Sequence, residues 1–221
     1  MSAAMSHVAL IDYGSGNLHS AGRALRAAAN LAGTPHEIRI THSPADILSA
    51  ERVVLPGVGH FADCAAGLRA QPGVVEALEE ACLKGSRPFL GICVGMQLLA
   101  ETGLEDGTTP GLGWIKGEVS RIQPGEGFRV PHMGWNGLSF ASEPPHPVLQ
   151  DLGEDPHVYF THSYAFTAKD PASIAATVGY GAEAIIAAVA QDNLFGTQFH
   201  PEKSQRVGMR LLANFLTWTP K

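Results

Sequence analysis

Apolar runs of strand length alternate with helix-period segments through the first hundred residues, and this alternation constrains the fold more than any other feature. A strand, a covering helix and a second, parallel strand form the repeating unit of α/β folds. We therefore predict an open, mostly parallel twisted sheet with helices on both faces. The predicted strands cover 7–12, 36–41, 52–57 and 88–93, and the predicted helices cover 18–29, a short stretch from Ser43, 61–70, 73–85 and 94–101.

The second half of the chain has a different sequence pattern. Beyond residue 102, Gly, Pro and short alternating stretches at 117–122 and 157–166 are typical of hairpins or edge strands. We therefore expect an added antiparallel hairpin region beside the parallel sheet. A strand ending near His200 follows, and an amphipathic helix over 204–220 closes the chain, with an apolar side formed by Val207, Leu211, Phe215 and Trp218.

Composition narrows the class of protein. The 221 residues carry a net charge of −6, and 45% are hydrophobic, which predicts one well-buried domain spanning 1–221. No nucleic-acid partner is expected, because phosphate binding needs clustered Lys and Arg. The apolar runs are too short and too closely flanked by charges to predict a membrane span. Three cysteines without CxxC spacing predict neither a disulfide framework nor a zinc knuckle, and they fit a reducing, cytoplasmic location.

Cys93 lies between two glycines, directly after a predicted strand. Gly-x-Cys-x-Gly at a strand-to-helix turn resembles a nucleophile elbow, whose strained turn lifts the reactive atom to the carboxyl edge of the sheet. The helix that begins at Val94 points its positive dipole end at the sulfur and favours the thiolate. The alternative is a small core cysteine, which is the role expected of Cys64 and Cys82.

His200 and Glu202 are the partners that a cysteine nucleophile needs. A base must take and return the thiol proton, and a third group must orient that base. Residues two apart on a strand project to the same side, so both side chains can face one place, with Pro201 stiffening the peptide between them. Alone, the segment also fits an exposed strand end. Because the elbow and this segment both reach one sheet edge, we predict a Cys93-His200-Glu202 catalytic triad.

Acyl transfer also needs hydrogen-bond donors for the oxyanion. The Val94 amide is one candidate. A second can come from the loop that begins at Pro56 and Gly57, in which the glycines let a peptide plane rotate toward the site. An ordinary strand-to-helix turn is the alternative. The run 12–17 lacks the spacing of a phosphate-binding loop, and we interpret it as a strand-end turn beside the same site.

Several histidines raise the question of a metal centre. Their spacing follows no ligand pattern, and no Asp or Cys accompanies them at fixed intervals. We predict no metal site and no cofactor. The histidines concerned are His132, His146, His157 and His162.

The motifs also occur together in a known order. On DYGSGN, LPGVGHF, GICVGMQ, PHMGWN and GTQFHPEKS, the chain resembles the class I glutamine amidotransferases over nearly its whole length. The elbow and HPE mark that class. DYGSGN, PGVG and PHMGWN are most similar to the glutaminase subunits of imidazole glycerol phosphate synthase, which work in histidine biosynthesis.

The resemblance implies a role for each matching residue. Cys93 would attack the amide of L-glutamine, His200 would protonate the leaving ammonia, and Glu202 would orient His200. Water would then hydrolyse the thioester to glutamate. By the same resemblance, the second oxyanion donor falls on Gly57 and Val58, and substrate binding falls on Gly59 and Gln97.

The resemblance further implies a (β/α)8 cyclase partner in a heterodimer, which receives the ammonia and joins it to a ribulosyl-type nucleotide. A PGVG peptide resting with its carbonyl toward the site would leave the oxyanion one donor, so we hypothesise that partner and nucleotide binding shift it. Without the resemblance, core packing and a solvated lysine are the ordinary interpretations of the positions it assigns to the interface. Those positions are Trp135, Asn136, Tyr159 and Lys203.

Three other functions fit parts of the sequence. A glutaminase belonging to another amidotransferase, such as pyridoxal phosphate synthase, would keep the triad and change the acceptor, but PHMGWN argues against it. A cysteine hydrolase of the same fold would act on peptides or small amides without transferring ammonia. A non-catalytic binding subunit would keep the fold alone, and the intact triad residues argue against it.

Overall fold

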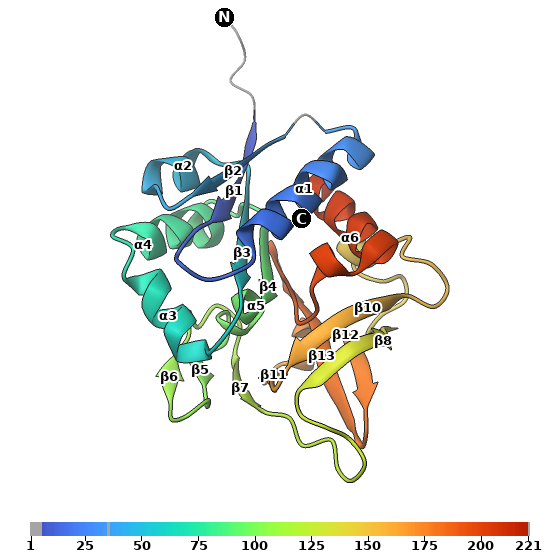
Figure 1. Ribbon diagram of the computed structural model, residues 1–221. Coiled ribbons are helices and arrows are strands. Elements are labelled where there is room, and N and C mark those ends of the chain that lie inside the picture. Colours follow the sequence, from blue (N-terminus) through green and yellow to red (C-terminus); the bar gives the residue numbers. More distant parts are fainter. Residues whose placement is uncertain (1–5, 35, 221) are drawn as a thin grey trace, which may run out of the picture.

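The computed structural model describes residues 6–34 and 36–220 (Figure 1). Within them, the main sheet has eight strands in the order β2-β1-β3-β4-β14-β13-β12-β9. Strands from β2 to β14 in this order pair in parallel, and the remaining three extend the sheet by antiparallel pairs. The predicted α/β fold is confirmed. The strands are β1 (His7–Ile11), β2 (Glu37–Thr41), β3 (Arg52–Gly57), β4 (Phe89–Cys93), β9 (Ser139–Phe140), β12 (Ile174–Tyr180), β13 (Glu183–Gln191) and β14 (Leu194–Thr197).

Helices cover both faces of the parallel part of the sheet. Figure 1 shows α1 and α6 together on one side and α2, α3 and α4 on the other. The α-helices are α1 (Leu18–Ala32), α2 (Pro44–Ser49), α3 (Phe61–Arg69), α4 (Val74–Leu78), α5 (Val94–Gln97) and α6 (Gln205–Thr217). Shorter helical turns are the π-helical η1 (Glu79–Lys84) and the 3-10 turns η2 (Pro147–Leu149), η3 (Pro171–Ser173) and η4 (Pro201–Lys203).

Helix α1 forms where the sequence supplies both of its ends. The Asn17 side chain accepts a hydrogen bond from the Ser20 amide at 3.2 Å, which satisfies one of the free amides of the first turn. Gly33 ends the helix in the left-handed conformation, with φ of 66°. The helix is therefore about one turn longer than predicted. Leu25 is fully buried on its inner face, which stabilises the packing by about 2 kcal/mol.

The antiparallel region consists of two smaller sheets. A four-stranded sheet has the order β11-β7-β5-β6, and β10 pairs with β8. Of the two alternatives predicted for 157–166, edge strands are confirmed and a hairpin is not, because β10 and β11 each lie at the edge of a different sheet. Only Ser163 separates them, which is too short for a hairpin turn, so the chain passes from one sheet to the next. These strands are β5 (Thr102–Gly103), β6 (Thr109–Pro110), β7 (Gly117–Arg121), β8 (His132–Gly137), β10 (His157–His162) and β11 (Tyr164–Ala168).

The helix after Cys93 is much shorter than the predicted 94–101. Helix α5 ends at Gln97, although the next residues are apolar and fully buried. The carbonyls of Leu98 and Ala100 accept hydrogen bonds from the amides of Leu112 and Gly113, at 2.7 and 2.9 Å. The Glu101 amide, which would donate to the Gln97 carbonyl in a helix over 94–101, donates instead to the Gly117 carbonyl at 3.0 Å. Bonds to a distant segment thus replace the last helical turn. The helix predicted over 73–85 consists of two parts, the α-helix α4 followed by the π-helical η1.

The last strand and the last helix frame the site. Strand β14 ends at Thr197, three residues before the predicted end, and the His200 amide instead donates to the Tyr159 carbonyl of β10 at 3.0 Å. Helix α6 packs its predicted apolar side inward. The buried Arg52 guanidinium donates to the carbonyls of Phe215 and Trp218, which fixes the end of α6 on the sheet.

Candidate active site

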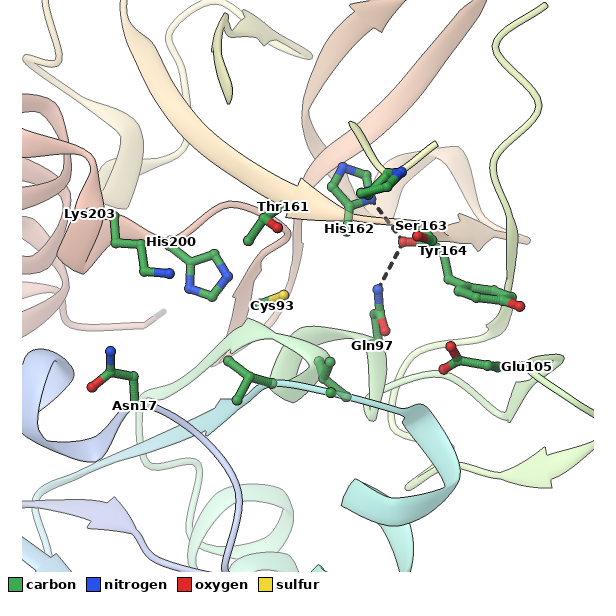
Figure 2. Close-up of a pocket in the computed structure, with 14 residues that line it drawn as sticks. Asn17, Cys93, Gln97, Glu105, Thr161, His162, Ser163, Tyr164, His200 and Lys203 are labelled. Carbon is green, nitrogen blue, oxygen red and sulfur yellow. Dashed lines mark hydrogen bonds between the residues drawn. The ribbon is translucent and has the colours of Figure 1, made fainter. Parts of the chain in front are cut away.

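A cavity of about 530 Å³ opens at the carboxyl ends of the central parallel strands (Figure 2). Gly57 at the end of β3 pairs with Cys93 at the end of β4, and the segment after β14 brings His200 to the same edge. Ligands of open α/β sheets bind at this kind of edge. The cavity is lined by Asn17, Val58, Gly59, Cys93, Val94, Gln97, Glu105, Pro131, Thr161, His162, Ser163, Tyr164, His200 and Lys203.

Cys93 sits on a strained turn between β4 and α5. Its φ of 55° and ψ of −112° are unusual for a residue with a side chain. A Cβ on Gly91 would lie 2.6 Å from the Gly95 carbonyl oxygen, and one on Gly95 would collide with the Leu55 carbonyl. Only glycine fits at both places. The thiol is 4% exposed and lies between His200 and Gln97 at the cavity (Figure 2).

His200 and Glu202 form a buried pair. The Nδ1 atom of His200 lies 2.8 Å from Glu202 Oε1, and the two side chains are 2% and 4% exposed. The reason differs from the predicted one, because Glu202 lies on the 3-10 turn η4 and not on a strand. Pro201 begins that turn, and the tight helical bend, not strand alternation, aims both side chains at each other.

The hydrogen bond to Glu202 decides what the other nitrogen of His200 can do. Nδ1 donates to the carboxylate, which leaves Nε2 for the substrate side. Among the described residues, Nε2 is buried without a hydrogen-bond partner. Burial alone would lower the pKa of His200, but hydrogen bonding and charge attraction from the Cys93 sulfur and the Glu202 carboxylate raise it to about 9. The imidazole therefore keeps a proton at neutral pH, the form that can protonate a leaving amine.

The two predicted oxyanion donors are in different situations. Val94 is the first residue of α5, so its amide has no acceptor within the helix and stays available at the cavity. The Val58 amide instead donates to the Ser15 hydroxyl at 3.3 Å, and this hydroxyl donates to the Val58 carbonyl at 2.7 Å. Ser15 thus holds both polar groups of Val58. Gly59 lies beside it at the cavity, with φ of 100°.

Gln97 lies on the opposite side of the cavity from His200. Its amide group donates to the Tyr164 carbonyl at 2.9 Å and to Gln198 Oε1 at 3.0 Å. Gln198 in turn donates to the Cys93 sulfur at 3.7 Å. Both nitrogen-bound hydrogens of Gln97 are therefore used within the protein. Its side-chain oxygen has no donor among residues 6–34 and 36–220 and can accept from a ligand.

Gln198 was missed by the sequence analysis, although it lies two residues before His200 in the QFHPE motif. It is fully buried and touches the thiol. A buried amide next to a catalytic motif was the available signal. Asn17 also lines the cavity, as expected for the turn over 12–17. The other cavity-lining residues missed come from segments in which we singled out no motif, and they are Glu105, Thr161, Ser163 and Tyr164.

Three of the four predicted interface residues form a row beside the cavity. The rings of Trp135 and Tyr159 meet edge to face at 6.0 Å, and Lys203 Nζ lies 5.8 Å from the centre of the Tyr159 ring. Lys203 lines the cavity, and Trp135 is 46% exposed. Asn136 is turned away from this row, because its amide donates to the Gly179 carbonyl at 2.9 Å.

The remaining cysteines and histidines have structural surroundings. Cys82 is fully buried, and burial raises the pKa of its thiol to about 12. Cys64 lies 3.2 Å from the Ser15 hydroxyl, beneath the PGVG loop. The spacing of His132 and His162 in the sequence predicted no common site, but the two side chains are hydrogen-bonded at 3.1 Å. In the described part of the chain, no group of three or more His, Cys, Asp or Glu side chains forms a metal-binding cluster.

Comparison with known proteins identifies the family. The sequence profile of glutamine amidotransferase class-I matches residues 9–218. The chain belongs to the class-I glutamine amidotransferase family. Two solved structures share the amidotransferase fold. One, described as a glutamine amidotransferase, covers 95% of this chain and 96% of its own at 20% identity, with a TM-score of 0.69. Another, a glutamine amidotransferase from Thermotoga maritima, covers 94% of this chain and 81% of its own at 18% identity, with a TM-score of 0.58.

Curated relatives of this amidotransferase are much more similar. The imidazole glycerol phosphate synthase subunit HisH of Rhodospirillum rubrum is 55% identical, over 96% of this chain and 99% of the relative. The subunit of the same name from Brucella abortus is 50% identical, over the same shares of both chains. The amidotransferase has, in residues 6–34 and 36–220, no helix of the length and apolar character needed to cross a membrane.

Proposed function

We propose that this amidotransferase is the glutaminase subunit of imidazole glycerol phosphate synthase, acting in histidine biosynthesis as a single domain. The buried His200–Glu202 pair beside Cys93 carries the proposal, because it is the arrangement a cysteine nucleophile needs for amide hydrolysis. The curated relatives support the choice of pathway over the pyridoxal phosphate alternative. A cytoplasmic location is part of the proposal and agrees with three free cysteines.

In the proposed mechanism, the Cys93 thiol gives its proton to His200 Nε2, and the resulting thiolate attacks the side-chain amide carbon of L-glutamine. The carbonyl oxygen becomes an oxyanion, and the Val94 amide stabilises it. His200 transfers its Nε2 proton to the amide nitrogen, the carbon–nitrogen bond breaks, and ammonia leaves. Water, deprotonated by His200, then attacks the thioester and releases glutamate and the thiol. Glu202 holds the imidazole in the tautomer that these steps need.

The second oxyanion donor is proposed to be switchable. In the observed conformation the Val58 amide is bound to Ser15, so Val94 acts alone. A missing donor corresponds to about 3 to 4 kcal/mol of transition-state stabilisation. We propose that binding of the partner and its nucleotide moves the Gly57–Val58 peptide away from Ser15 and aims its amide at the site.

The substrate and partner assignments follow from position. Gln97, with its free oxygen, and Gly59 line the cavity where glutamine would bind. The row of Trp135, Tyr159 and Lys203 runs from this cavity to the surface. An exposed aromatic beside a catalytic cavity suits a protein interface. A (β/α)8 cyclase docked there would receive ammonia without its loss to solvent.

The decisive experiment measures glutamate release by the purified chain, with and without a candidate cyclase and nucleotide. We expect slow turnover by the chain alone and fast turnover in the complex. Cys93→Ala should abolish glutamate release yet leave ammonia-dependent synthesis by the complex nearly intact, because the acceptor chemistry belongs to the other chain. Loss of both activities together would contradict this division of labour, and equal turnover with and without partner would contradict the switch.

A further inference from the structure

A continuous chain of buried and partly buried hydrogen bonds connects strand β8 to the sulfur of Cys93. It begins at Asn136, whose Nδ2 lies 3.4 Å from His132 Nε2. His132 Nδ1 lies 3.1 Å from His162 Nε2, and His162 Nδ1 lies 2.9 Å from the Tyr164 carbonyl oxygen. This oxygen also accepts from Gln97, which continues to Gln198 and the thiol. Figure 2 shows the two bonds that meet at Tyr164.

The chemistry of the groups fixes the direction of every bond in the chain. A carbonyl oxygen only accepts, so His162 Nδ1 must carry a hydrogen, and its Nε2 is then an acceptor when the ring is neutral. His132 Nδ1 therefore donates, and His132 Nε2 accepts from Asn136. Asn136 Oδ1 accepts from the Gly137 amide at 2.9 Å, which confirms that its nitrogen faces His132. Burial lowers the pKa of both histidines to about 4, so both are neutral at physiological pH.

The same logic fixes the two glutamines. Tyr164 presents an oxygen, so Gln97 must turn its nitrogen to it, and the second hydrogen of that nitrogen meets Gln198 Oε1. The Gln198 nitrogen is then the end that faces Cys93 at 3.7 Å. A donor toward the sulfur stabilises the thiolate. If the Tyr164 carbonyl moved, Gln97 would lose its anchor, and Gln198 would be free to present its oxygen to the sulfur instead.

The His132 end of this hydrogen-bond chain is held by aromatic stacking and lies under the protein surface. The His132 ring stacks on Tyr180 at 4.0 Å and on Phe160 at 4.7 Å, with both rings nearly parallel to it. The neighbouring residues of β8 point outward, and Met133 and Trp135 are 63% and 46% exposed. His132 is buried on one face of β8, and the other face of the strand is exposed. Contacts on the exposed face can therefore shift the strand and change the position of His132.

We propose that His132 is a positioning residue for glutamine hydrolysis, which acts through His162 and the Tyr164 carbonyl to keep the Gln198 amide directed at Cys93. This inference rests on the proposed function. The chain is satisfied at every link, and a fully satisfied buried network holds its members in one arrangement. The strand that carries PHMGWN is thus connected to the nucleophile by hydrogen bonds, in addition to its place beside the cavity.

The first test replaces His132 by Phe, which keeps the stacking and removes both nitrogens. The variants are assayed in the full chain with its cyclase partner for kcat and KM, and as the chain alone for the rate of Cys93 alkylation by iodoacetamide. For His132→Phe we expect kcat and the alkylation rate to fall about five- to tenfold, with KM changed less than about twofold. His132→Asn keeps a donor near the Nδ1 position and should restore about half of the loss on a logarithmic scale.

His146→Phe is the matched control. His146 is also a largely buried histidine stacked on an aromatic ring, Phe195 at 4.9 Å, but it lies outside the cavity and the chain. We expect a similar loss of thermal stability in both Phe variants and normal activity and alkylation in the control. Wild-type kcat and alkylation in folded His132→Phe, or no recovery in His132→Asn, would overturn the proposal.

A double-mutant cycle tests the connection itself. Gln198→Leu removes the last donor and should slow alkylation about five- to tenfold without disturbing the His132 end. If the chain is one unit, His132→Phe combined with Gln198→Leu should be no slower than Gln198→Leu alone, within about twofold. Losses that simply multiply would mean that the two residues act independently. Wild-type alkylation in Gln198→Leu would overturn the last link even if His132→Phe failed to fold.

The outcomes separate this proposal from the function on which it rests. A wild-type complex without glutaminase activity would contradict the proposed function. The alkylation rates would still show whether the hydrogen-bond chain from His132 influences Cys93. An active wild-type complex with an equally active His132→Phe variant would contradict the positioning role alone.

Discussion

At the scale of single residues, the site depends on which nitrogen of His200 faces the substrate. Glu202 accepts from Nδ1 at 2.8 Å within a pair that is almost fully buried. Strand alternation predicted that the two side chains would face one place, and they do meet, although not on a strand. The 3-10 turn that begins at Pro201 directs the two side chains toward each other. In the proposed mechanism, the carboxylate orients the base and takes no part in the proton transfers.

Replacement of the two partners should have unequal effects. His200→Ala removes the group that transfers the proton and should lower kcat by about a thousandfold or more. Glu202→Gln keeps an oxygen that can accept from Nδ1 and should lower kcat by about ten- to a hundredfold. Steady-state glutamate release by the complex measures both. Equal losses would contradict the assignment of an orienting role to Glu202.

Ser15 is predicted to restrain the oxyanion loop. Its hydroxyl holds both the amide and the carbonyl of Val58, so Ser15→Ala should free the peptide to turn toward Cys93. We expect glutamate release by the chain alone to rise about fivefold, the value of one ordinary hydrogen bond, with little change in the fully activated complex. Ser49→Ala on α2, whose hydroxyl bonds only within its own helix, is the control. A lower rate in Ser15→Ala would show that Ser15 supports the active conformation instead.

At the scale of elements, the elbow depends on how closely β3 and β4 approach α5. Gly95 lies against the Leu55 carbonyl of β3, and Gly91 lies against the backbone of α5. The local sequence predicted the strand, the turn and the start of the helix. It did not predict the end of the helix, because the Glu101 amide donates to the Gly117 carbonyl, which belongs to a segment more than ten residues away.

Gly95→Ala should therefore destabilise the protein by about 3 kcal/mol or more, because the new methyl group meets backbone that cannot move without shifting β3. The free energy of unfolding in urea measures this loss. Gly179→Ala is a control in open space, with no atom within 4 Å of the new carbon, and should change stability little. Similar stability of both variants would contradict the tight contact at the elbow.

At the scale of the whole molecule, buried histidines make stability depend on pH in two directions. Burial lowers the pKa of His132 and His162 to about 4, below the value near 6.5 of an unfolded chain. Their contribution is complete above about pH 6.5 and is lost as the pH falls toward 4, because the unfolded state binds protons first. The pKa of His200 is raised to about 9, so its contribution is complete below about pH 6.5 and is lost as the pH rises toward 9.

The free energy of unfolding should therefore be highest between about pH 6 and 7 and should fall on both sides. Each of these buried histidines contributes at most about 3 kcal/mol, since one pKa unit corresponds to about 1.4 kcal/mol. Urea unfolding at intervals of one pH unit from about 5 to 9 measures the profile. His132→Phe should flatten the acidic side only. A steady rise in stability across this range would contradict the assigned pKa of His200.

The sequence by itself determined the features that depend on neighbouring residues. Apolar periodicity specified the parallel strands, Ser43 and Pro44 started α2, and the two glycines around Cys93 specified the elbow. The motif order was enough to point to the family. All of these features depend on residues that are close together in the sequence, where turn-forming residues and the alternation of side chains determine the local structure directly.

Tertiary structure alone decided the rest, because the contacts join segments far apart in the chain. It placed Ser15 on the Val58 amide, Gln198 against the thiol, and His132 against His162, thirty positions away. Spacing along the sequence carries no record of which nitrogen faces which oxygen. Hydrogen-bond direction is set only when burial brings the groups together and leaves each donor a single acceptor.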